Sequence, residues 1–317
     1  MQLATATHFD RQDPPIALDS RRRSPAKVQT PAPFMKWAGG KARLIPQIEP
    51  YLPQGQLRYG EAFLGGGALF FYLAGHDRLD TALLTDLSTD VHNAHTCVRD
   101  QPQALVDQLQ VYEDEYLAGD ADERAAYFYW MRSRHPAEVE MTVVERAARM
   151  LFLNRTCFNG LWRENSKGHF NAPHGRYPQP NIVQSARISA ASQALQQAAL
   201  VQADFRAWPQ LAKDHGLDFV YLDPPYQPVS ATSSFNAYSG GGFSARAQRE
   251  LNDVLRELDA MGVRWVLSNS DCAFTRDLYQ EWNIHTIYAA RQVNSKADRR
   301  GDVAEVVVTN RRTGLRW

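Results

Sequence analysis

Cysteine, net charge and long apolar runs are all scarce in this sequence of 317 residues. The three cysteines, Cys97, Cys157 and Cys272, are far apart, odd in number and without C-x-x-C spacing, which excludes a disulfide framework and favours a reducing cytoplasm. With no ligand spacing among the nine histidines either, we expect no metal. No apolar run approaches the roughly 18 residues that span a bilayer, and no signal-peptide core is visible. We therefore expect a cytoplasmic protein that enters no membrane.

The charge balance places a limit on anionic partners. Lys and Arg total 35 and Asp and Glu total 35, so any basic binding surface must be local. Hydrophobic residues make up 44% of the chain, enough for a sizeable core in one large domain with an insert or in two domains. Residues 1–33 are rich in Pro, Arg, Asp, Gln, Ala and Thr without apolar periodicity, which predicts a disordered tail.

Seven segments have the composition of β-strands, and they fall into two groups along the chain. They begin near Tyr59, Thr81, Ala199, Leu217, Val263, Ile284 and Ala304. The last two alternate polar and apolar residues, which is typical of antiparallel strands, whereas the others indicate buried parallel strands. Residues 92–197 interrupt this pattern with helical periodicity. We therefore predict an α/β fold with a seven-stranded mixed sheet, built from residues 34–91 and 198–317, with a mainly helical insert.

The sequence Asp223-Pro224-Pro225-Tyr226 directly follows the strand-forming run 217–222. A strand that ends in a carboxylate and two prolines predicts a buried parallel strand whose carboxyl end lies at the ligand-binding edge of the sheet. The prolines lack N–H donors and keep their carbonyls free, so a carboxylate and a backbone acceptor can face one pocket. With an aromatic ring beside them, they suit an amino group on a flat heterocycle. The alternative is an ordinary proline turn.

Two glycine turns offer close backbone approach to a ligand. The first lies in Lys36-Trp37-Ala38-Gly39-Gly40-Lys41, where cationic groups could bind a carboxylate or phosphate, although the spacing is not that of a P-loop. The second, Gly65-Gly66-Gly67, joins a short strand to a helix. Asp86 lies about 20 positions later at the end of the next strand, where nucleotide-type folds bind a ribose diol. The pattern favours an adenosine-containing cofactor over mere packing.

Residues 154–177 concentrate positive charge in an otherwise neutral chain. The charged residues are Arg155, Arg163, Lys167 and Arg176 against Glu164. Asn165-Ser166-Lys167-Gly168 supplies turn chemistry between two arms, so we predict a β-hairpin. Arginine reads guanine, amides read adenine and apolar side chains contact thymine methyls, which makes the hairpin a candidate for reading DNA. The alternative is an exposed polar loop without a ligand.

Taken in order, these motifs resemble the Dam-type (D12 class) adenine-N6 DNA methyltransferases in the alpha arrangement. The resemblance rests on K-W-A-G-G-K from Lys36, F-L-G-G-G from Phe63, T-D ending at Asp86, the F-N-G-L-W-R to F-N-A-P-H-G-R-Y hairpin, A-D-F ending at Phe205, and D-P-P-Y. Pro228 to Thr232, with Phe235 and Tyr238, extends it. It implies that 34–91 and 198–317 form the catalytic domain and that 92–197 form a target-recognition domain. The expected enzyme is a monomer that acts on double-stranded DNA.

The resemblance also implies roles for individual residues. S-adenosylmethionine would be bound by Trp37, Lys41, Phe63, Gly65, Asp86, Asp204, Phe205 and Asp223. Asp86 would hold the ribose, and Asp204 with Phe205 the cofactor adenine. Asp223, Pro224 and Tyr226 would be catalytic and face a flipped adenine.

The DNA contacts implied by the resemblance are Lys36, Phe158, Asn159, Leu161, Arg163, Pro173, Arg176 and Tyr177. In Dam enzymes that read GATC, the position of Lys36 contacts the first guanine, and those of Leu161 and Arg163 read the distal half. The positions of Phe158 and Asn159 hold the duplex and the orphaned thymine. This chain departs in having Phe158 where tyrosine is common and Glu164 after the arginine. GATC is the predicted target.

The expected chemistry follows from the adenine amino group, whose lone pair is delocalised into the ring. Hydrogen bonds from N6–H to the Asp223 carboxylate and the Pro224 carbonyl would localise that lone pair for direct methyl transfer. Two alternatives remain: methylation of another amine, such as cytosine N4 or adenine in RNA, and sequence-specific DNA binding without catalysis.

Overall fold

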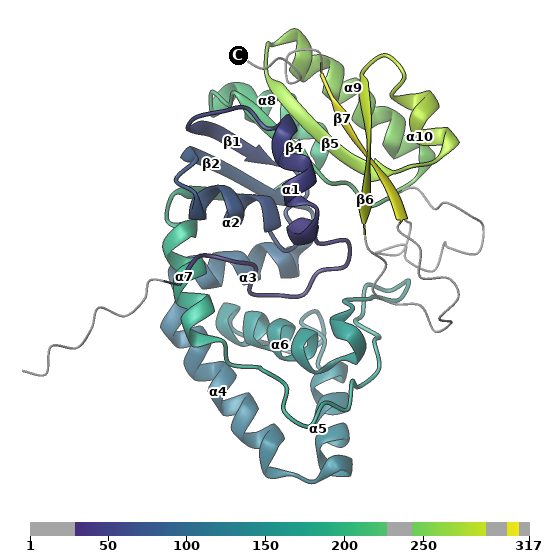
Figure 1. Cartoon of the computed structure of the whole chain (residues 1–317). Helices are drawn as coiled ribbons and strands as arrows, with labels where there is room; N and C mark the ends of the chain where they lie inside the picture. Colours follow the sequence, from purple (N-terminus) through teal and green to yellow (C-terminus); the bar gives the residue numbers. More distant parts are fainter. Residues whose placement is uncertain (1–28, 227–242, 290–302, 311–317) are drawn as a thin grey trace, which may run out of the picture.

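The computed structural model describes residues 29–226, 243–289 and 303–310. Within them, seven strands form one mixed sheet in the order β3-β2-β1-β4-β5-β7-β6 (Figure 1). The strands are β1 Leu57–Glu61, β2 Leu79–Asp86, β3 Ala198–Gln202, β4 Phe219–Leu222, β5 Arg264–Ser270, β6 Asn283–Ala289 and β7 Val303–Thr309. The predicted α/β fold with a seven-stranded mixed sheet is confirmed.

The sheet contains a point at which the order of the strands reverses. β1 pairs in parallel with β2 on one side and with β4 on the other, and β2 pairs in parallel with β3. β4 pairs in parallel with β5, whereas β7 is antiparallel to both β5 and β6, as the alternating residues predicted. Since ligands of open α/β sheets bind at the carboxyl ends of strands where the order reverses, the gap between β1 and β4 is the expected ligand position.

Alternating side chains of the central strands pack into two apolar cores, one on each face of the sheet. Phe219 and Tyr221 of β4 belong to the first core, and Val220 and Leu222 belong to the second. This alternation follows from the strand period of two. All four residues are buried because helices cover both faces, as in doubly wound sheets.

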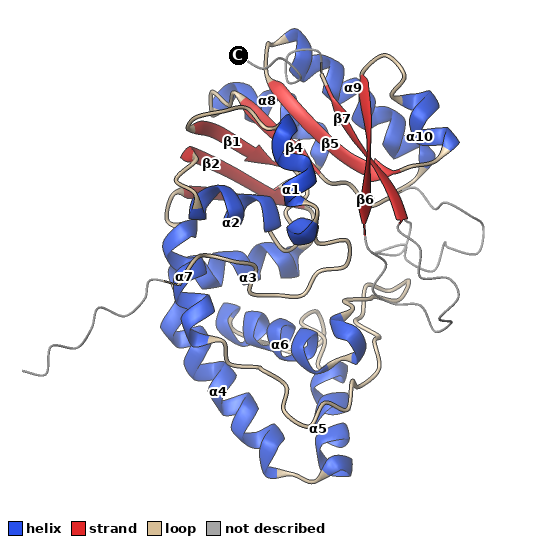
Figure 2. Ribbon diagram, viewed as in Figure 1, coloured by secondary structure: helices blue, strands red, loops and turns tan. Residues whose placement is uncertain are grey.

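The helices divide between the two faces and the insert (Figure 2). Their bounds are α1 Ile45–Ile48, α2 Ala68–Gly75, α3 Thr89–Asp100, α4 Pro102–Ala118, α5 Ala121–Ser133, α6 Val143–Thr156, α7 Ser185–Leu195, α8 Trp208–Asp214, α9 Ala245–Ala260 and α10 Ala273–Leu278. Helices α1, α2, α3 and α7 contribute to the first core, and α8 and α9 to the second. None of these helices is long and apolar enough to cross a membrane.

Two helix starts show how local sequence fixes these boundaries. Ser244 caps α9 by accepting a hydrogen bond from the Ala247 N–H at 3.1 Å, as its position before the helix predicted. Thr142 and Glu145 form a reciprocal capping box at the start of α6. Such caps satisfy N–H groups that the first helical turn leaves without partners.

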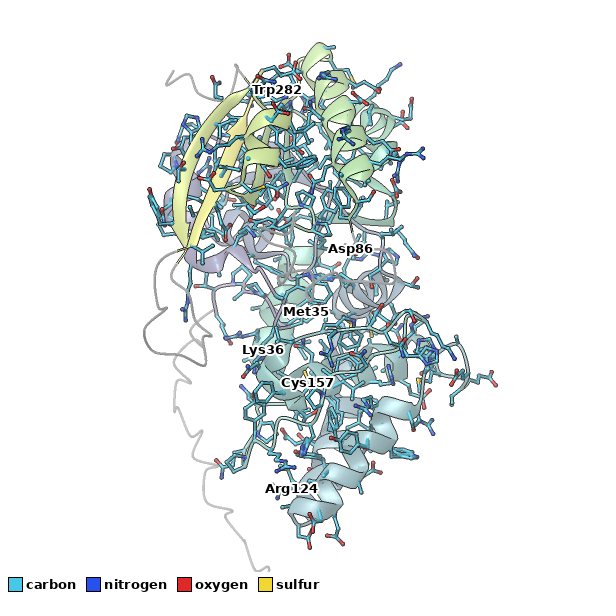
Figure 3. The ribbon with its side chains drawn as sticks, turned by 90° about the vertical axis from the view of Figure 1, so that its right-hand side faces the viewer. Met35, Lys36, Asp86, Arg124, Cys157 and Trp282 are labelled. Atoms are coloured by element: carbon cyan, nitrogen blue, oxygen red, sulfur yellow. The ribbon has the colours of Figure 1, made fainter. Side chains whose placement is uncertain are left out.

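The insert shares a continuous core with the sheet. Phe128 of α5 and Phe152 of α6 belong to the same apolar cluster as Tyr59 of β1 and Phe70 of α2. Figure 3 shows the two parts stacked lengthwise, with Met35, Lys36 and Cys157 near their junction. The insert is therefore packed directly onto the first face of the sheet.

Residues that precede position 34 already contact helices of the folded protein. The Pro33 carbonyl accepts a hydrogen bond from Arg187 at 3.2 Å, and a Cβ at Gly75 would lie 3.1 Å from Thr30. Part of the segment expected to be a tail thus contacts α7 and α2. The rest of that segment, including the arginine triplet 21–23, lies outside the described residues, as does Pro228 to Tyr238.

Candidate active site

The carboxyl end of β4 brings three of the predicted residues together. Lys41 Nζ lies 2.9 Å from Asp223 Oδ1 and 4.6 Å from the centre of the Tyr226 ring. The same ammonium donates to the Gly39 carbonyl at 2.6 Å, which holds the first glycine turn against it. Lys41 is 3% exposed, and a lysine this deeply buried requires a charged partner. The Asp223 carboxylate is that partner.

Asp223 keeps an open acceptor position. Its buried Oδ1 atom faces the Lys41 ammonium at 2.9 Å, and because a carboxylate has about four lone-pair sites, acceptor capacity remains. Burial raises the pKa of Asp223 to about 6, while the Lys41 cation opposes the shift and Glu305 adds to it. At neutral pH the group is therefore a carboxylate with an unused lone pair, which is the chemistry that an N–H donor requires.

A second buried carboxyl, Glu61, lies at the end of β1. It is 3% exposed and accepts hydrogen bonds from the Tyr59 hydroxyl at 2.8 Å and from the Phe70 N–H at 3.2 Å. Burial raises its pKa to about 8, with Asp223 and Asp86 adding to the shift. Glu61 is therefore neutral at pH 7, which leaves Asp223 as the ionised partner of Lys41.

The D-P-P-Y segment is hydrogen-bonded to other elements at two consecutive residues. The Tyr226 hydroxyl donates to Glu305 Oε2 of β7 at 2.6 Å. The Pro225 carbonyl accepts from Gln248 Nε2 of α9 at 3.2 Å. The segment thus has partners on β7 and α9 as well as Lys41.

The second glycine turn is joined to the end of β2. Asp86 Oδ2 accepts from the Gly65 N–H at 2.9 Å, and Oδ1 accepts from the Ser88 N–H at 2.8 Å. Burial raises the pKa of Asp86, and these N–H donors oppose the shift. Gly65 has φ +47, and a Cβ there would lie 2.5 Å from the Trp37 ring, so this position requires glycine. Four predicted residues of the cofactor site are adjacent: Trp37, Gly65, Asp86 and, through the turn, Phe63.

Three phenylalanines from different elements form an aromatic cluster beside this turn. Phe63 and Phe205 have ring centres 5.9 Å apart at 30°, and Phe243, which precedes α9, lies 5.7 Å from Phe63 and 5.3 Å from Phe205. Asp204 caps the short 3-10 helix at Phe205–Ala207 through the Arg206 N–H and pairs with the Arg206 guanidinium at 2.8 Å. Both Asp204 and Asp223 thus have a cationic partner, Arg206 and Lys41 respectively.

The predicted hairpin is present as a short antiparallel pair of arms. The Asn171 N–H donates to the Arg163 carbonyl at 2.8 Å and the Asn165 N–H to the His169 carbonyl at 2.9 Å, with a single bridge between Glu164 and Phe170. Asn165 Oδ1 accepts from the N–H groups of Lys167 and His169, which closes the turn. A second bridge joins Cys157 to His174, so pairing is limited to isolated bridges.

Side chains alternate between exposed and buried along the first arm, so the side chains predicted to contact bases face outward. Trp162 is buried and packs on Phe170 at 4.5 Å, whereas Leu161 and Arg163 on either side are exposed. Phe158 is 53% exposed, so its ring is accessible to a ligand. The Arg163 guanidinium donates to Asn171 Oδ1 at 2.6 Å, which orients it along the surface.

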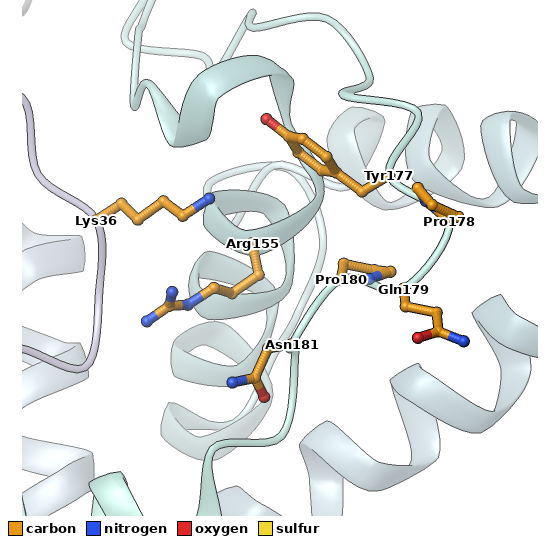
Figure 4. A pocket seen from close by; sticks show the side chains of 7 residues that line it. All are labelled: Lys36, Arg155, Tyr177, Pro178, Gln179, Pro180 and Asn181. Carbon is orange, nitrogen blue, oxygen red and sulfur yellow. The ribbon is translucent and has the colours of Figure 1, made fainter. Parts of the chain in front are cut away.

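Two of the predicted DNA-contact residues, Lys36 and Tyr177, line an open cavity of about 590 Å³. It is lined by Lys36, Arg155, Tyr177, Pro178, Gln179, Pro180 and Asn181, and Figure 4 shows the Lys36 ammonium directed toward the Tyr177 ring, 5.3 Å from its centre. The Tyr177 hydroxyl accepts from the Asn159 N–H at 2.9 Å. Gly160, with φ +65, lies against the lysine side chain, where a Cβ would be only 2.2 Å away.

The remaining two candidates lie on the second arm. Pro173 and Arg176 are exposed, and the Pro173 carbonyl accepts from the Phe158 N–H at 2.9 Å. These contacts bring Phe158 beside Pro173, and Asn159 and Lys36 beside Tyr177.

Sequence reasoning missed four residues of the site: Glu61, Phe243, Gln248 and Glu305. Glu61 could have been found from the sequence, because it is the last residue of β1, just as Asp86 is the last residue of β2 and Asp223 directly follows β4. Glu305 read as a wet-face residue of an alternating strand, and Gln248 as one polar residue in a helix. Glu305 and Gln248 are recognised as site residues only from the packing of β7 and α9 against β4 and β5.

Comparison with known proteins agrees with this geometry. Residues 37–293 match the family described as D12 class N6 adenine-specific DNA methyltransferase. The chain is 39% identical over 282 residues to the type II methyltransferase M1.LlaDCHI of Lactococcus lactis subsp. cremoris, which covers 88% of this chain and 95% of that protein.

Two further relatives are similar over the same span. The type II methyltransferase M.MjaIII of Methanocaldococcus jannaschii is 35% identical, with 88% of this chain and 98% of the relative covered. A DNA adenine methylase of Serratia marcescens is 32% identical, with the same two coverages. A family match over most of the chain, together with relatives of nearly the same extent, identifies the protein: it belongs to the D12 class of N6 adenine-specific DNA methyltransferases.

Proposed function

We propose that this enzyme transfers the methyl group of S-adenosylmethionine to N6 of an adenine flipped out of duplex DNA, within the sequence GATC, and that it acts as a monomer. The observation that carries the proposal is the open acceptor of Asp223, which lies beside Tyr226 at the reversal point of the sheet.

The residues beside the second glycine turn fit the cofactor. Asp86 uses one N–H donor on each oxygen, so each keeps a lone pair for a ribose diol. The Phe63, Phe205 and Phe243 cluster offers aromatic faces to an adenine, and the Asp204 carboxylate would accept from its amino group. Trp37 and Lys41 would lie at the methionine end. The bound cofactor supplies an electrophilic methyl group on a sulfonium.

The chain itself prepares the amine. Asp223 Oδ1 and the Pro224 carbonyl accept the two N6–H hydrogens, which draws the lone pair out of the ring. Tyr226 stacks on the base, and stacking at roughly 1 to 3 kcal/mol offsets part of the few kcal/mol that flipping costs. Asp223 need not remove a proton first, because the amine becomes acidic only once methylated.

The proposed target follows from the surface around Lys36. Residues 92–197 act as the target-recognition domain, in which Leu161 and Arg163 contact the distal half-site. Lys36, from the segment that precedes the first glycine turn, contacts the first guanine. Arg163 is exposed and held by Asn171, and a guanidinium of fixed direction can donate to the two acceptors of guanine. Phe158 contacts the orphaned thymine in this proposal, because its exposed ring is accessible to a base.

The experiment incubates the protein with methyl-labelled S-adenosylmethionine and unmethylated plasmid. The product is then digested with one endonuclease that cuts only unmethylated GATC and one that cuts only methylated GATC. Protection from the first and cleavage by the second are expected. Label in DNA without protection would overturn the target sequence but not the methyl transfer, and the absence of label in DNA would overturn duplex DNA as the substrate.

A further inference from the structure

We propose that Gln248 and Glu305 are positioning residues that set the direction of the Pro224 carbonyl in the D-P-P-Y segment. We call them the two anchors. The inference rests on the proposed function, because it assigns to Pro224 the role of accepting from the adenine amine.

The segment cannot be fixed by its own N–H groups. Pro224 and Pro225 have none, so the backbone between Asp223 and Tyr226 offers only carbonyls to the rest of the protein. The rings fix both φ angles, which leaves the two ψ angles of the prolines as the remaining freedom. Holding the Pro225 carbonyl fixes one of them. The Pro224 carbonyl lies in the peptide plane that includes the Pro225 nitrogen, so restricting Pro225 restricts this plane as well.

Gln248 has the contacts of a fixed donor. It is fully buried, and its Nε2 donates to the Pro225 carbonyl at 3.2 Å. Its Oε1 accepts from Asn269 Nδ2 of β5 at 3.2 Å and from the Tyr279 hydroxyl at 3.3 Å. Exchanging the amide oxygen and nitrogen would place the oxygen against the Pro225 carbonyl and the N–H group against the Asn269 amide donor, so the orientation of the amide is fixed.

The second anchor holds the next residue. Glu305 accepts from the Tyr226 hydroxyl at 2.6 Å, and it is paired with Ser270 in the β5–β7 ladder, one residue from Asn269. Both anchors are therefore supported by the same end of β5. Because that ladder is part of the sheet and packs into both apolar cores, the two hydrogen bonds tie the segment to rigid elements.

The test measures kcat, together with KM for S-adenosylmethionine and for plasmid DNA, from the total label incorporated. Gln248→Met removes the amide at similar volume, and Gln248→Leu removes it with an apolar side chain of different shape. The matched control is Asn252→Leu. Asn252 is an equally buried amide one turn further along α9, and its partners, Leu278, Glu281 and Trp282, lie away from the D-P-P-Y segment.

We expect both Gln248 variants to lower kcat by about 10- to 100-fold, as small misplacements of a reacting group do, with KM for the cofactor within about twofold. Asn252→Leu should lower the melting temperature to a similar extent but leave kcat within about twofold. Glu305→Gln, which still accepts from the Tyr226 hydroxyl, should retain more activity than Glu305→Leu.

Unchanged kcat in both Gln248 variants would overturn the inference, and so would an equal loss in Asn252→Leu. The ratio of the variant's kcat to that of the wild type is calculated from total label, so it does not depend on which sequence is methylated. If the proposed target sequence is wrong, only the position of the label in the DNA changes. If Gln248 does not position the segment, the ratio stays at one. If the variants fail to fold at 25 °C, activity is measured at the temperature where their near-UV circular dichroism matches that of the wild type.

Discussion

The reactivity of the site depends on which protons two buried carboxyl groups hold. Asp223 is ionised at neutral pH with a lysine beside it, whereas Glu61 is protonated between a tyrosine hydroxyl and an N–H group. Two carboxylates near one cation would repel each other, and burial resolves this by keeping one of them neutral. Three predictions follow from this arrangement at the scale of single residues.

Removing the carboxylate should stop methyl transfer. Asp223→Ala is expected to lower kcat at least about 100-fold, because the acceptor of the amine hydrogens is lost. Cofactor binding should stay measurable by calorimetry. The control is Asp218→Ala, an exposed carboxylate at the opposite end of β4 that pairs with Arg58. Full activity in Asp223→Ala would contradict the mechanism.

Methyl transfer should have an acidic limb near pH 6. Since the pKa of Asp223 is raised to about 6 by burial, the carboxylate is protonated below this pH and no longer accepts. Single-turnover rates should fall about tenfold for each pH unit below it and level off above it. Cofactor binding measured at the same pH values separates this effect from unfolding. A rate that is flat from pH 5 to 8 would refute the assignment.

Glu61 should make the protein less stable as the pH rises. Its pKa is 4.5 in the unfolded chain and about 8 in the folded protein, so only the folded state holds the proton between these values. Stability is therefore fully present below pH 4.5 and is lost as the pH rises through 8, by up to about 1.4 kcal/mol per unit.

The matching variant is Glu61→Gln, which keeps an oxygen for Tyr59 and Phe70 but does not titrate. Urea unfolding at pH 5.5 and pH 8.5 should show a gain for the variant that grows with pH. An equal difference at both values would show that Glu61 carries no proton in the folded protein.

At the scale of elements, the recognition surface is built from irregular segments held by regular ones. Buried Trp162 and Phe170 turn Leu161 and Arg163 outward, and the Cys157–His174 bridge fixes the base of the second arm. Side chains held by packing on both sides keep a direction, which reading a base edge requires.

Arg163→Ala should therefore relax discrimination at one base pair. Against the three other base pairs at that position, we expect the preference to fall by about 1 to 3 kcal/mol, with little change elsewhere. The comparison is Lys167→Ala at the exposed turn, where losing a charge should weaken all duplexes alike and reduce the salt dependence of binding. Equal losses on cognate and mismatched duplexes for Arg163→Ala would rule out base reading.

At the scale of the whole molecule, one buried amide joins the insert to the catalytic sheet. Asn154 of α6 accepts from the Lys36 N–H at 2.8 Å and donates to the Lys36 carbonyl at 2.7 Å and to the Gly160 carbonyl at 3.3 Å. Lys36 lies directly before the first glycine turn, so this amide links the proposed DNA-contact residues to the proposed cofactor site.

Asn154→Leu should lower the free energy of unfolding by about 2 to 3 kcal/mol, because it leaves buried backbone groups of Lys36 without partners. It should also weaken DNA binding, since the direction of the Lys36 side chain depends on this backbone. Gln110→Leu on the exposed side of α4 should change stability by less than about 0.5 kcal/mol. Unfolding monitored by urea, with DNA binding measured separately, checks both effects.

The strand bounds were largely predictable because local pattern decides them. The run before Asp223 is buried throughout and ends at two prolines, and the alternation in β6 and β7 indicated antiparallel pairing, although Val306 to Thr309 of β7 are all buried and do not alternate. The glycine turn and Asp86 were also predictable as a pair, since sheet topology brings the ends of successive parallel strands to one edge.

The sequence by itself therefore determined the sheet, its helical insert and the strand end where the chemistry lies. Only the tertiary structure decided that Lys41 pairs with Asp223, that Glu305 holds Tyr226 and that Gln248 holds the Pro225 carbonyl. Periodicity encodes which face of an element is buried, but it carries no information on which distant side chain meets which. That pairing depends on the order of the strands and on the register of β7 against β5, and it appears only when the whole sheet is assembled.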